Sequence, residues 1–399
     1  MRPSLYCTGK PSPERLAAFL APMTAHTSFV GEARASGVLY KGPTRQASLT
    51  NMSISAIIPV HNGGQKFIRC LTSLKEGLKQ PEEIIVVVDG GTDESERVAN
   101  EFATLVFRFP SAGGPARARN FGAAQAKGDV LLFIDADVTI PPHAIETIER
   151  AFERHPHMDA LFGSYDDDPA ERNFLSQYRN LLHHYVHQQG REDASTFWGA
   201  CGAIRRDLFL SIRGFDEGYV RPSIEDIELG YRLKKAGARI TLCKSLQVKH
   251  LKRWNVRSML EADFFQRALP WTDLILRDRK LINDLNTTMS ARTSVVLSFL
   301  LVACLVLSYR QPLLLAGAAA AGTMLVVLNA ALYRFFVVKR GLAFAVQSIF
   351  WHWAYFLYSG VAFIVGTVRH AVNRVTSSKK HPPYPHQRTG IEASRMERR

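Results

Sequence analysis

Residues 54–60 read Ile-Ser-Ala-Ile-Ile-Pro-Val, and residues 84–88 read Ile-Ile-Val-Val-Val. Both are short apolar runs of the kind that forms buried strands. Between them, apolar residues recur at the spacing of one helical face: Phe67, Leu71, Leu74 and Leu78. A third run, residues 130–134, follows a helical stretch at residues 116–126. Strands that alternate with helices predict parallel pairing and right-handed crossovers, and therefore an α/β layered sheet.

Polar segments stand directly after these three apolar runs. They are His61-Asn62-Gly63, Asp89-Gly90-Gly91-Thr92-Asp93 and Asp135-Ala136-Asp137. In open α/β sheets ligands bind beyond the carboxyl ends of the strands. The sequence therefore predicts a binding site at the edge of the sheet where these segments meet.

The segment Asp135-Ala136-Asp137 carries the most specific chemistry. Alternation along a strand would send both carboxylates to the same face, where they would repel each other unless a positive charge lay between them. A divalent cation with oxygen ligands, Mn²⁺ or Mg²⁺, fits that position. The remaining coordination positions of such a cation suit a diphosphate.

Four of these stretches together resemble, in order, the motifs of the family 2 glycosyltransferases with the GT-A fold. The stretches are residues 56–62 (AIIPVHN), 84–93 (IIVVVDGGTD), 113–122 (GGPARARNFG) and 135–137 (DAD). The resemblance continues through residues 215–217 (FDE) and 225–229 (EDIEL) to His250, and so covers about residues 53–250. It implies a Rossmann-like domain that binds a nucleotide sugar. The apolar segments that follow this domain predict a C-terminal transmembrane helical region.

The resemblance also implies where the nucleotide binds. Pro59, His61 and Asn62 are expected to line the nucleotide pocket, and Asp89 is expected to face the base. Many relatives carry a second acidic or amide residue where this chain has Gly90, so the choice of base is left open.

The sugar diphosphate and the metal are assigned in the same way. Arg119 and Asn120 match an arginine-asparagine pair expected near the sugar diphosphate, and a planar guanidinium suits phosphate oxygens. Asp137 matches the usual metal-binding carboxylate, with Asp135 placed towards the ribose or the sugar. His250 stands where many relatives place a histidine that completes the metal site, although a lone histidine is more often structural.

Glu225 and Asp226 correspond to the acidic pair that activates the acceptor in this family. A base is needed because an acceptor hydroxyl must lose its proton as its bond to the anomeric carbon forms. By family analogy Asp226 is the expected base, with Glu225 as the alternative. A purely structural role is the alternative, because two acidic residues at the start of a helix interact favourably with the helix dipole.

The predicted reaction is the inverting transfer of a sugar from a nucleoside diphosphate sugar. The stretch from His250 to Trp254 looks like a degenerate Q-x-x-R-W motif of processive polysaccharide synthases. Because it lacks the glutamine, the addition of a single sugar is favoured over processive synthesis. Two alternatives are kept: a catalytically silent membrane scaffold, and a nucleotidyltransferase. The first is disfavoured by the intact Asp137, Glu225 and Asp226, and the second by the absence of a Gly-rich, Lys-containing loop after the first strand.

The net charge of +14 is concentrated at the two ends of the chain. Residues 1–51 hold six Lys or Arg against two Glu, and residues 369–399 hold eight against two. The remaining body carries no basic stripe interleaved with aromatic residues, so nucleic acid is not an expected partner. Basic tails beside apolar segments favour contact with anionic lipid headgroups.

Three segments after residue 292 contain no charged side chain: residues 293–309, 312–333 and 342–368. A bilayer core needs about 20 apolar residues, so two or three membrane helices are predicted. Three full spans would place the basic C-terminal tail opposite the catalytic domain, against the positive-inside rule. The third segment is therefore expected to span, to be re-entrant, or to lie in the interface.

These patterns divide the chain into four parts: a disordered basic extension at 1–51, a GT-A domain at 52–290, a membrane region at 291–368, and a basic cytoplasmic or disordered tail at 369–399. Met52 is a candidate for the natural start. The expected location is the cytoplasmic (inner) membrane, multi-pass, with the catalytic domain on the cytoplasmic side. The expected acceptor is a lipid or a lipid-linked molecule.

Overall fold

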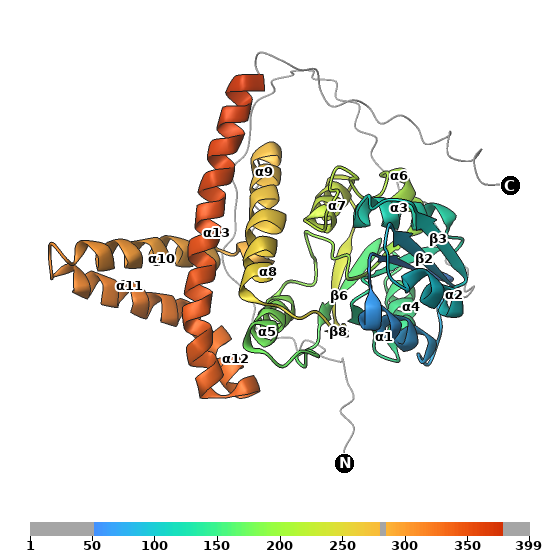
Figure 1. Ribbon diagram of the computed structural model, residues 1–399, viewed down its shortest axis with the longest axis horizontal. Coiled ribbons are helices and arrows are strands. Elements are labelled where there is room, and N and C mark those ends of the chain that lie inside the picture. Colours follow the sequence, from blue (N-terminus) through green and yellow to red (C-terminus); the bar gives the residue numbers. More distant parts are fainter. Residues whose placement is uncertain (1–51, 280–284, 378–399) are drawn as a thin grey trace, which may run out of the picture. The chain divides into compact units, whose positions relative to one another are not determined.

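The computed structural model describes residues 52–279 and 285–377, so the predicted extension at 1–51 and most of the predicted tail lie outside the described residues. Its centre is an eight-stranded sheet in the order β3-β2-β1-β4-β7-β6-β8-β5 (Figure 1). The strands are β1 Ile54–Val60, β2 Glu83–Asp89, β3 Leu105–Phe109, β4 Val130–Ile134, β5 Val138–Thr139, β6 Ala160–Tyr165, β7 Cys201–Arg205 and β8 Ile240–His250.

The first four strands pair in parallel, with β1 between β2 and β4. The side chains of β1, β2 and β4 are almost all buried on both faces, which is why the sequence shows continuous apolar runs there rather than alternation. The predicted strands at 54–60, 84–88 and 130–134 are confirmed, as is the mixed α/β fold class. Beyond β4 the sheet becomes mixed, because β7 pairs antiparallel with both β4 and β6.

Helices cover both faces of the sheet. One core cluster joins the strands to α1, α2 and α4, and a second joins them to α3, α6 and α7. The bounds are α1 Gly64–Lys75, α2 Ser95–Phe102, α3 Pro115–Gln125, α4 Ala144–Arg154, α5 Phe174–Gln189, α6 Arg206–Ser211 and α7 Glu225–Lys235. The carboxyl ends of β1, β2 and β4 remain open between these layers.

A short antiparallel pairing brings two distant parts of the chain to this open edge. The two-residue strand β5 pairs with the end of β8, so that Val138 lies opposite His250. Because Asp137 directly precedes β5, this register places it beside His250.

The chain after β8 is helical. It contains α8 Val256–Glu261, a π-helix η1 Ala262–Ala268, α9 Leu269–Asp278, a 3₁₀ turn η2 Leu285–Thr287, α10 Met289–Leu307, α11 Leu314–Leu328, α12 Ala330–Arg340 and α13 Leu342–Ser377. Among the described residues, two helices are long and apolar enough to cross a membrane, at Met289–Leu307 and Leu342–Val372. A bent pair, α11 and α12, would add a third if it formed one span.

The predicted second apolar segment is interrupted. Its helix ends at Leu328, and α12 leaves at an angle of 65°. The side-chain amide of Asn329 lies at the break and donates to Ser294 Oγ (3.0 Å) and to the carbonyl of Leu325 (2.9 Å). The third segment, by contrast, is one continuous helix of 36 residues rather than a re-entrant loop.

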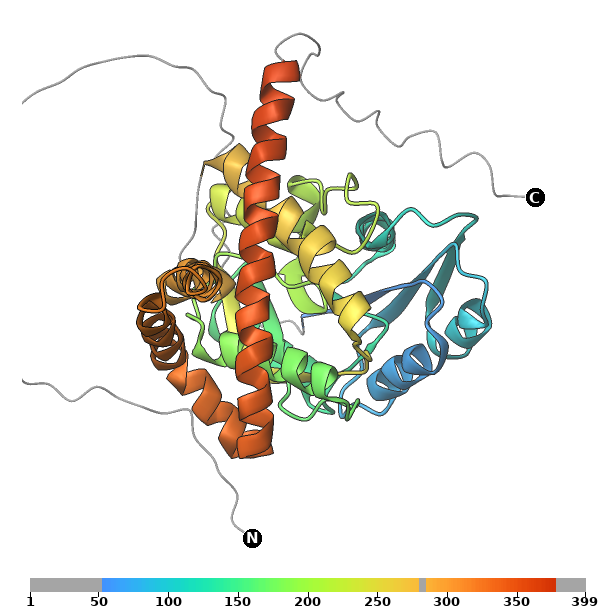
Figure 2. The same ribbon diagram turned by 60° about the vertical axis from the view of Figure 1, so that its left-hand side comes forward.

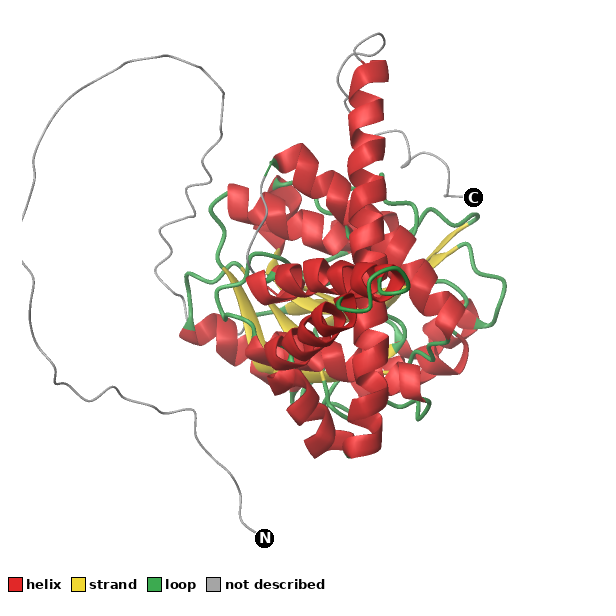
Figure 3. Ribbon diagram, turned by 90° about the vertical axis from the view of Figure 1, so that its left-hand side faces the viewer, coloured by secondary structure: helices red, strands yellow, loops and turns green. Residues whose placement is uncertain are grey.

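The hairpin of α10 and α11 projects away from the sheet, whereas α13 crosses the base of this hairpin and runs beside α9 (Figures 1 and 2). Polar contacts fix α13 to the preceding helices. The hydroxyl of Tyr358 donates to Asp263 Oδ2 (2.7 Å), and Arg369 pairs with Asp273. Figure 3 shows the same crossing from the side of the hairpin.

Candidate active site

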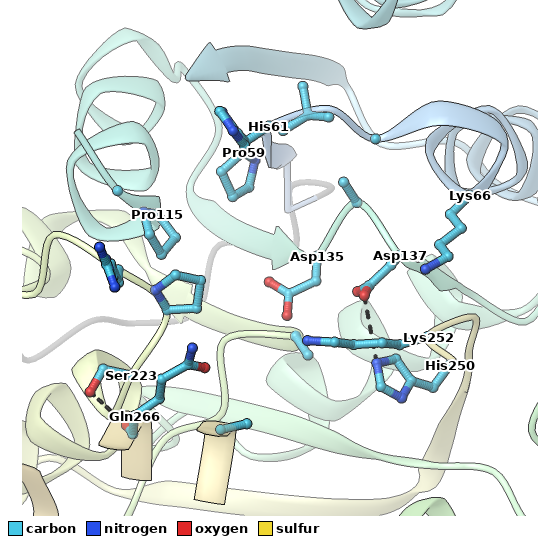
Figure 4. A pocket seen from close by; sticks show the side chains of 18 of the residues that line it. Pro59, His61, Lys66, Pro115, Asp135, Asp137, Ser223, His250, Lys252 and Gln266 are labelled. Atoms are coloured by element: carbon cyan, nitrogen blue, oxygen red, sulfur yellow. Dashed lines mark hydrogen bonds and ion pairs between the residues drawn. The ribbon is translucent and has the colours of Figure 1, made fainter. Parts of the chain in front are cut away.

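A cavity of about 990 Å³ lies beyond the carboxyl ends of β1, β2 and β4. Its lining includes nearly all of the predicted site residues: Pro59, His61, Asn62, Asp89, Arg119, Asp135, Asp137, Glu225, Asp226 and His250. Figure 4 shows Asp135 and Asp137 side by side in this cavity, with His250 and Lys252 next to Asp137. Asn120 is not among the lining residues.

The segment after β1 is fixed to the segment after β2. His61 Nδ1 donates to the backbone carbonyl of Asp89 (2.7 Å). Asn62 has a positive φ of 51°, a conformation that asparagine adopts more readily than most residues, and its Oδ1 accepts from the amide of Thr92 (2.8 Å). These bonds hold both loops open around the predicted nucleotide pocket.

The carboxylate of Asp89 is buried and fully engaged. Its two oxygens accept from the backbone amides of Gly113 and Gly114, each at 2.8 Å. Gly114 has a φ of 95°, which allows the chain to turn sharply into α3. Asp89 therefore shapes the entrance of α3, and its expected contact with the base stays a prediction.

Arg119 on α3 connects two carboxylates from different parts of the chain. Its guanidinium pairs with Asp135 Oδ1 (2.6 Å) and with Glu225 Oε1 (3.0 Å), and the side chain is only 5% exposed. Asp135 is thus held by an arginine rather than left free for a cation. Charge pairing replaces the repulsion that the two adjacent carboxylates would otherwise suffer.

Asn120 points to the other side of α3 and anchors a loop. Its Oδ1 accepts from the amide of Phe215 (2.8 Å), and its Nδ2 donates to the carbonyl of Phe215 and to Glu217 Oε1, both at 2.9 Å. Its amide group is therefore engaged in structural contacts. Nothing in this arrangement supports the expected role of Asn120 beside the sugar diphosphate.

Asp137 and His250 come together at the β5–β8 pairing, with Oδ2 and Nε2 3.7 Å apart. Burial alone would raise the pKa of Asp137, but the nearby charges of His250, Lys252 and Lys66 lower it to about 2. The ring of His250 stacks on Tyr165, with ring centroids 4.4 Å apart. Asp137 is therefore ionised and its partner is held in a fixed plane.

These two side chains can hold a divalent cation only together with a ligand. No group of three or more His, Cys, Asp or Glu side chains arranged to hold a metal occurs within residues 52–279 and 285–377. Asp137 and His250 supply two donors, and Mg²⁺ sites in enzymes often combine one or two carboxylates with substrate phosphates. The residues present thus fit a cation that arrives with a diphosphate.

Glu225 and Asp226 form the first turn of α7 on the opposite side of the cavity. Glu225 is buried and accepts from Arg119 and from the amide of Ser223 (2.8 Å). Asp226 accepts from the amides of Gly199 (3.1 Å) and Ile227 (2.8 Å). Burial and the neighbouring charge of Glu225 raise the pKa of Asp226 to about 6. A carboxylate with that pKa can accept a proton near neutral pH.

Several cations in the cavity were missed in the sequence. Lys66, Arg221, Lys252 and Arg267 line it, and none has a carboxylate partner within the described part of the chain. Lys252 rests on the ring of Trp254 at 4.2 Å. The degenerate motif at residues 250–254 could have identified Lys252 as a site residue. No sequence pattern predicted the π-helix that contains Arg267.

Comparison with known proteins gives consistent matches. Residues 55–213 match the sequence profile described as glycosyl transferase family 2. A glycosyltransferase, GlyG, of Streptococcus pneumoniae serotype 4 is 30% identical over 30% of this chain and 42% of its own length. A glucosyl-dolichyl phosphate glucuronosyltransferase of Haloferax volcanii is 25% identical over 47% of this chain and 64% of its own length. The chain thus spans less than two thirds of either relative.

Among solved structures, a mannosyltransferase from Pyrobaculum calidifontis, in complex with GDP-Man and Mn²⁺, is 15% identical. The match covers 79% of this chain and 88% of that chain, with a TM-score of 0.49.

Proposed function

From its membership of the family 2 glycosyltransferases, we propose that the protein transfers one sugar from a nucleoside diphosphate sugar to a lipid or lipid-linked acceptor, with inversion. A bond forms between an acceptor oxygen and the anomeric carbon, from the face opposite the leaving group. The bond between that carbon and the diphosphate oxygen breaks, and its electron pair leaves with the nucleoside diphosphate. The proton of an acceptor hydroxyl passes to Asp226.

The observation that carries this proposal is the placement of two carboxylates with opposite pKa shifts in one cavity. Asp137 has its pKa lowered to about 2 and stays ionised, as a ligand for a cation requires. Asp226 has its pKa raised to about 6 and can exchange a proton, as a general base requires. Titratable groups whose environments push their pKa values apart are typical of acid and base assignments in active sites.

The donor side is assigned to the strand ends. Pro59, His61 and Asn62 line the nucleotide part of the cavity, and Asp137 with His250 would hold Mn²⁺ or Mg²⁺. That cation would supply positive charge to the leaving diphosphate. Arg119 keeps Asp135 oriented at the same edge.

The acceptor side faces the helical C-terminal part. The presence of two helices long enough to cross a membrane supports a membrane-bound acceptor, as does the name of the Haloferax volcanii relative, a transferase acting on a dolichyl phosphate sugar. The basic tails support a cytoplasmic orientation of the catalytic domain.

The test is nucleoside diphosphate release by the full chain in detergent, across a panel of nucleotide sugars with Mn²⁺ or Mg²⁺ and total membrane lipids as acceptor. We expect metal-dependent release from one donor, lost in both Asp137→Ala and Asp226→Asn. Release of pyrophosphate instead would indicate a nucleotidyltransferase. Absence of release from every donor would indicate the silent scaffold.

A further inference from the structure

A second cavity, of about 620 Å³, lies between the helices of the C-terminal part. It is enclosed by α5, η1, α9, α10 and α13, and its lining is largely apolar. Among the apolar lining residues are Ile275, Val295, Phe299, Phe356 and Phe363. We call it the helix cavity. Its size and lining suit a hydrocarbon chain better than a hydrated ligand.

The α10–α11 hairpin projects away from the sheet (Figure 1), and residues of both α10 and α13 line the helix cavity. Val296 on α10 is 67% exposed, and Phe363 and Ile364 on α13 are 45% and 54% exposed. All three line the cavity. An apolar chain that lies along the hairpin can therefore enter from the side, without crossing water.

The helix cavity adjoins the active-site cavity. Arg179, His183 and Arg267 line both. Asp226 lines the active-site cavity that begins on the other side of these residues. A molecule with its chain in the helix cavity would therefore present its polar end towards the proposed base.

The junction between the cavities carries an excess of positive charge. Asp263 is the only carboxylate among the described residues that line the helix cavity, and both of its oxygens are occupied. One accepts from Arg179 (2.5 Å), and the other accepts from Tyr358 (2.7 Å). Arg267 is exposed within the cavity and has no carboxylate partner within the described residues. An anionic ligand group at this junction would balance the excess positive charge.

Resting on the proposed function, we propose that the helix cavity is the acceptor subsite and that the acceptor is a lipid-linked phosphate or diphosphate. Its hydrocarbon chain occupies the helix cavity, and its phosphate pairs with Arg267 beside Arg179. The phosphate is a recognition element and is not consumed. The reacting oxygen is a hydroxyl on the group beyond the phosphate, which enters the active-site cavity and gives its proton to Asp226 as the sugar is transferred.

The test uses the full chain in phosphatidylcholine nanodiscs and dodecyl phosphate with a diazirine at the end of its chain. After illumination, labelled peptides are identified by mass spectrometry. We expect label on α9, α10 or α13, displaced by unlabelled dodecyl phosphate. Dodecanol, which lacks the charge, and inorganic phosphate, which lacks the chain, should displace it far less.

Two variants and two matched controls locate the site. Arg267→Gln should reduce labelling roughly tenfold or more, since a charge-assisted pair is lost, and Arg267→Lys should restore part of it. Arg253→Gln removes the same charge from an exposed position outside both cavities and should label as wild type. Val296→Trp should obstruct the cavity mouth, whereas Val306→Trp, also 67% exposed on α10 but outside the cavity, should not.

The outcomes separate this proposal from the proposed function. Equal labelling of wild type, Arg267→Gln and Val296→Trp, or equal displacement by dodecanol, would show that the cavity only takes up bulk lipid. The expected labelling pattern without nucleoside diphosphate release in the same samples would keep the lipid site and reject transfer. Release of nucleoside diphosphate without the expected labelling pattern would support the proposed sugar transfer and contradict the acceptor subsite in the helix cavity.

Discussion

The two walls of the active-site cavity are stabilised in different ways. In the strand-end wall, formed by residues 59–66, 89, 112–119 and 135–137, polar side chains such as Asp89 and Asn62 bind neighbouring loops. In the far wall, residues 220–226 and 250–267, cations without carboxylate partners among the described residues face the cavity. Substitutions of the loop-binding side chains in the first wall, which do not include the proposed cation ligand Asp137, should therefore cost mainly stability. Substitutions in the second wall should affect mainly activity or binding.

The largest expected effect is on turnover, from Asp226→Asn in the far wall. Loss of a general base should lower kcat by about 10³-fold while the melting temperature stays close to that of wild type. Because Asp226 acts as a base only when ionised, the wild-type rate should rise with pH and level off above an apparent pKa of about 6. The measurement is the pH profile of nucleoside diphosphate release.

Glu225→Gln serves as the comparison for that experiment. If Glu225→Gln abolished the rise in rate near pH 6 and Asp226→Asn did not, the general base would be Glu225. A large drop in melting temperature for Asp226→Asn would contradict the expectation that substitutions in the far wall affect mainly activity or binding.

Arg119→Met should have the next largest effect, because Arg119 joins the two walls. Its removal leaves the carboxylates of Asp135 and Glu225 near each other without their cation. Breaking a buried ion pair in this way costs roughly 3 kcal/mol or more. Thermal unfolding in detergent should show the loss, and Arg117→Met, an exposed arginine on the same helix, should change it little.

Asp89→Ala should destabilise the strand-end wall by a smaller amount. It leaves the amides of Gly113 and Gly114 without their acceptor, at a cost of about 2 kcal/mol. Asp89→Asn keeps one acceptor and should lie between Ala and wild type in melting temperature. Equal melting temperatures for all three would show that the turn into α3 does not depend on this carboxylate.

The smallest effect is expected where the helical part meets the sheet domain at the surface. Lys339 pairs with Asp167, and both side chains are about one third exposed. Exposed ion pairs contribute at most about 1 kcal/mol. Lys339→Ala should therefore shift the melting temperature by no more than a few degrees, and a shift as large as that of Arg119→Met would mean that this pair fastens the two parts together.

The strand-end wall could be predicted from the sequence because it follows directly from local pattern. The apolar runs of β1, β2 and β4 mark buried strands, and the polar residues after them must meet at one edge. The proximity of Asp137 and His250 was expected from family resemblance, and the β5–β8 register places them together.

In the far wall, Glu225, Asp226 and His250 were expected from family resemblance, whereas the cations of this wall could not be predicted, since they come together through tertiary packing. The double pairing of Arg119 depends on residues 16 and 106 positions away in the sequence. Arg267 faces the cavity because of a π-helix, whose extra residue per turn leaves no periodic signal. The bend at Asn329 was also missed, although a lone amide side chain within an apolar run was a possible sign.

The α10–α11 hairpin has a consequence for the direction in which a product can move. At 1.5 Å per residue, the 19 residues of α10 extend about 28 Å, close to the thickness of a bilayer core. Two helices lying against each other enclose no channel, and α13 crosses their base instead of completing a bundle (Figures 1 and 3). On the proposed function, a lipid glycosylated by an enzyme anchored in this way would stay in the leaflet where it was made. Its use on the other side of the membrane would require a separate flippase.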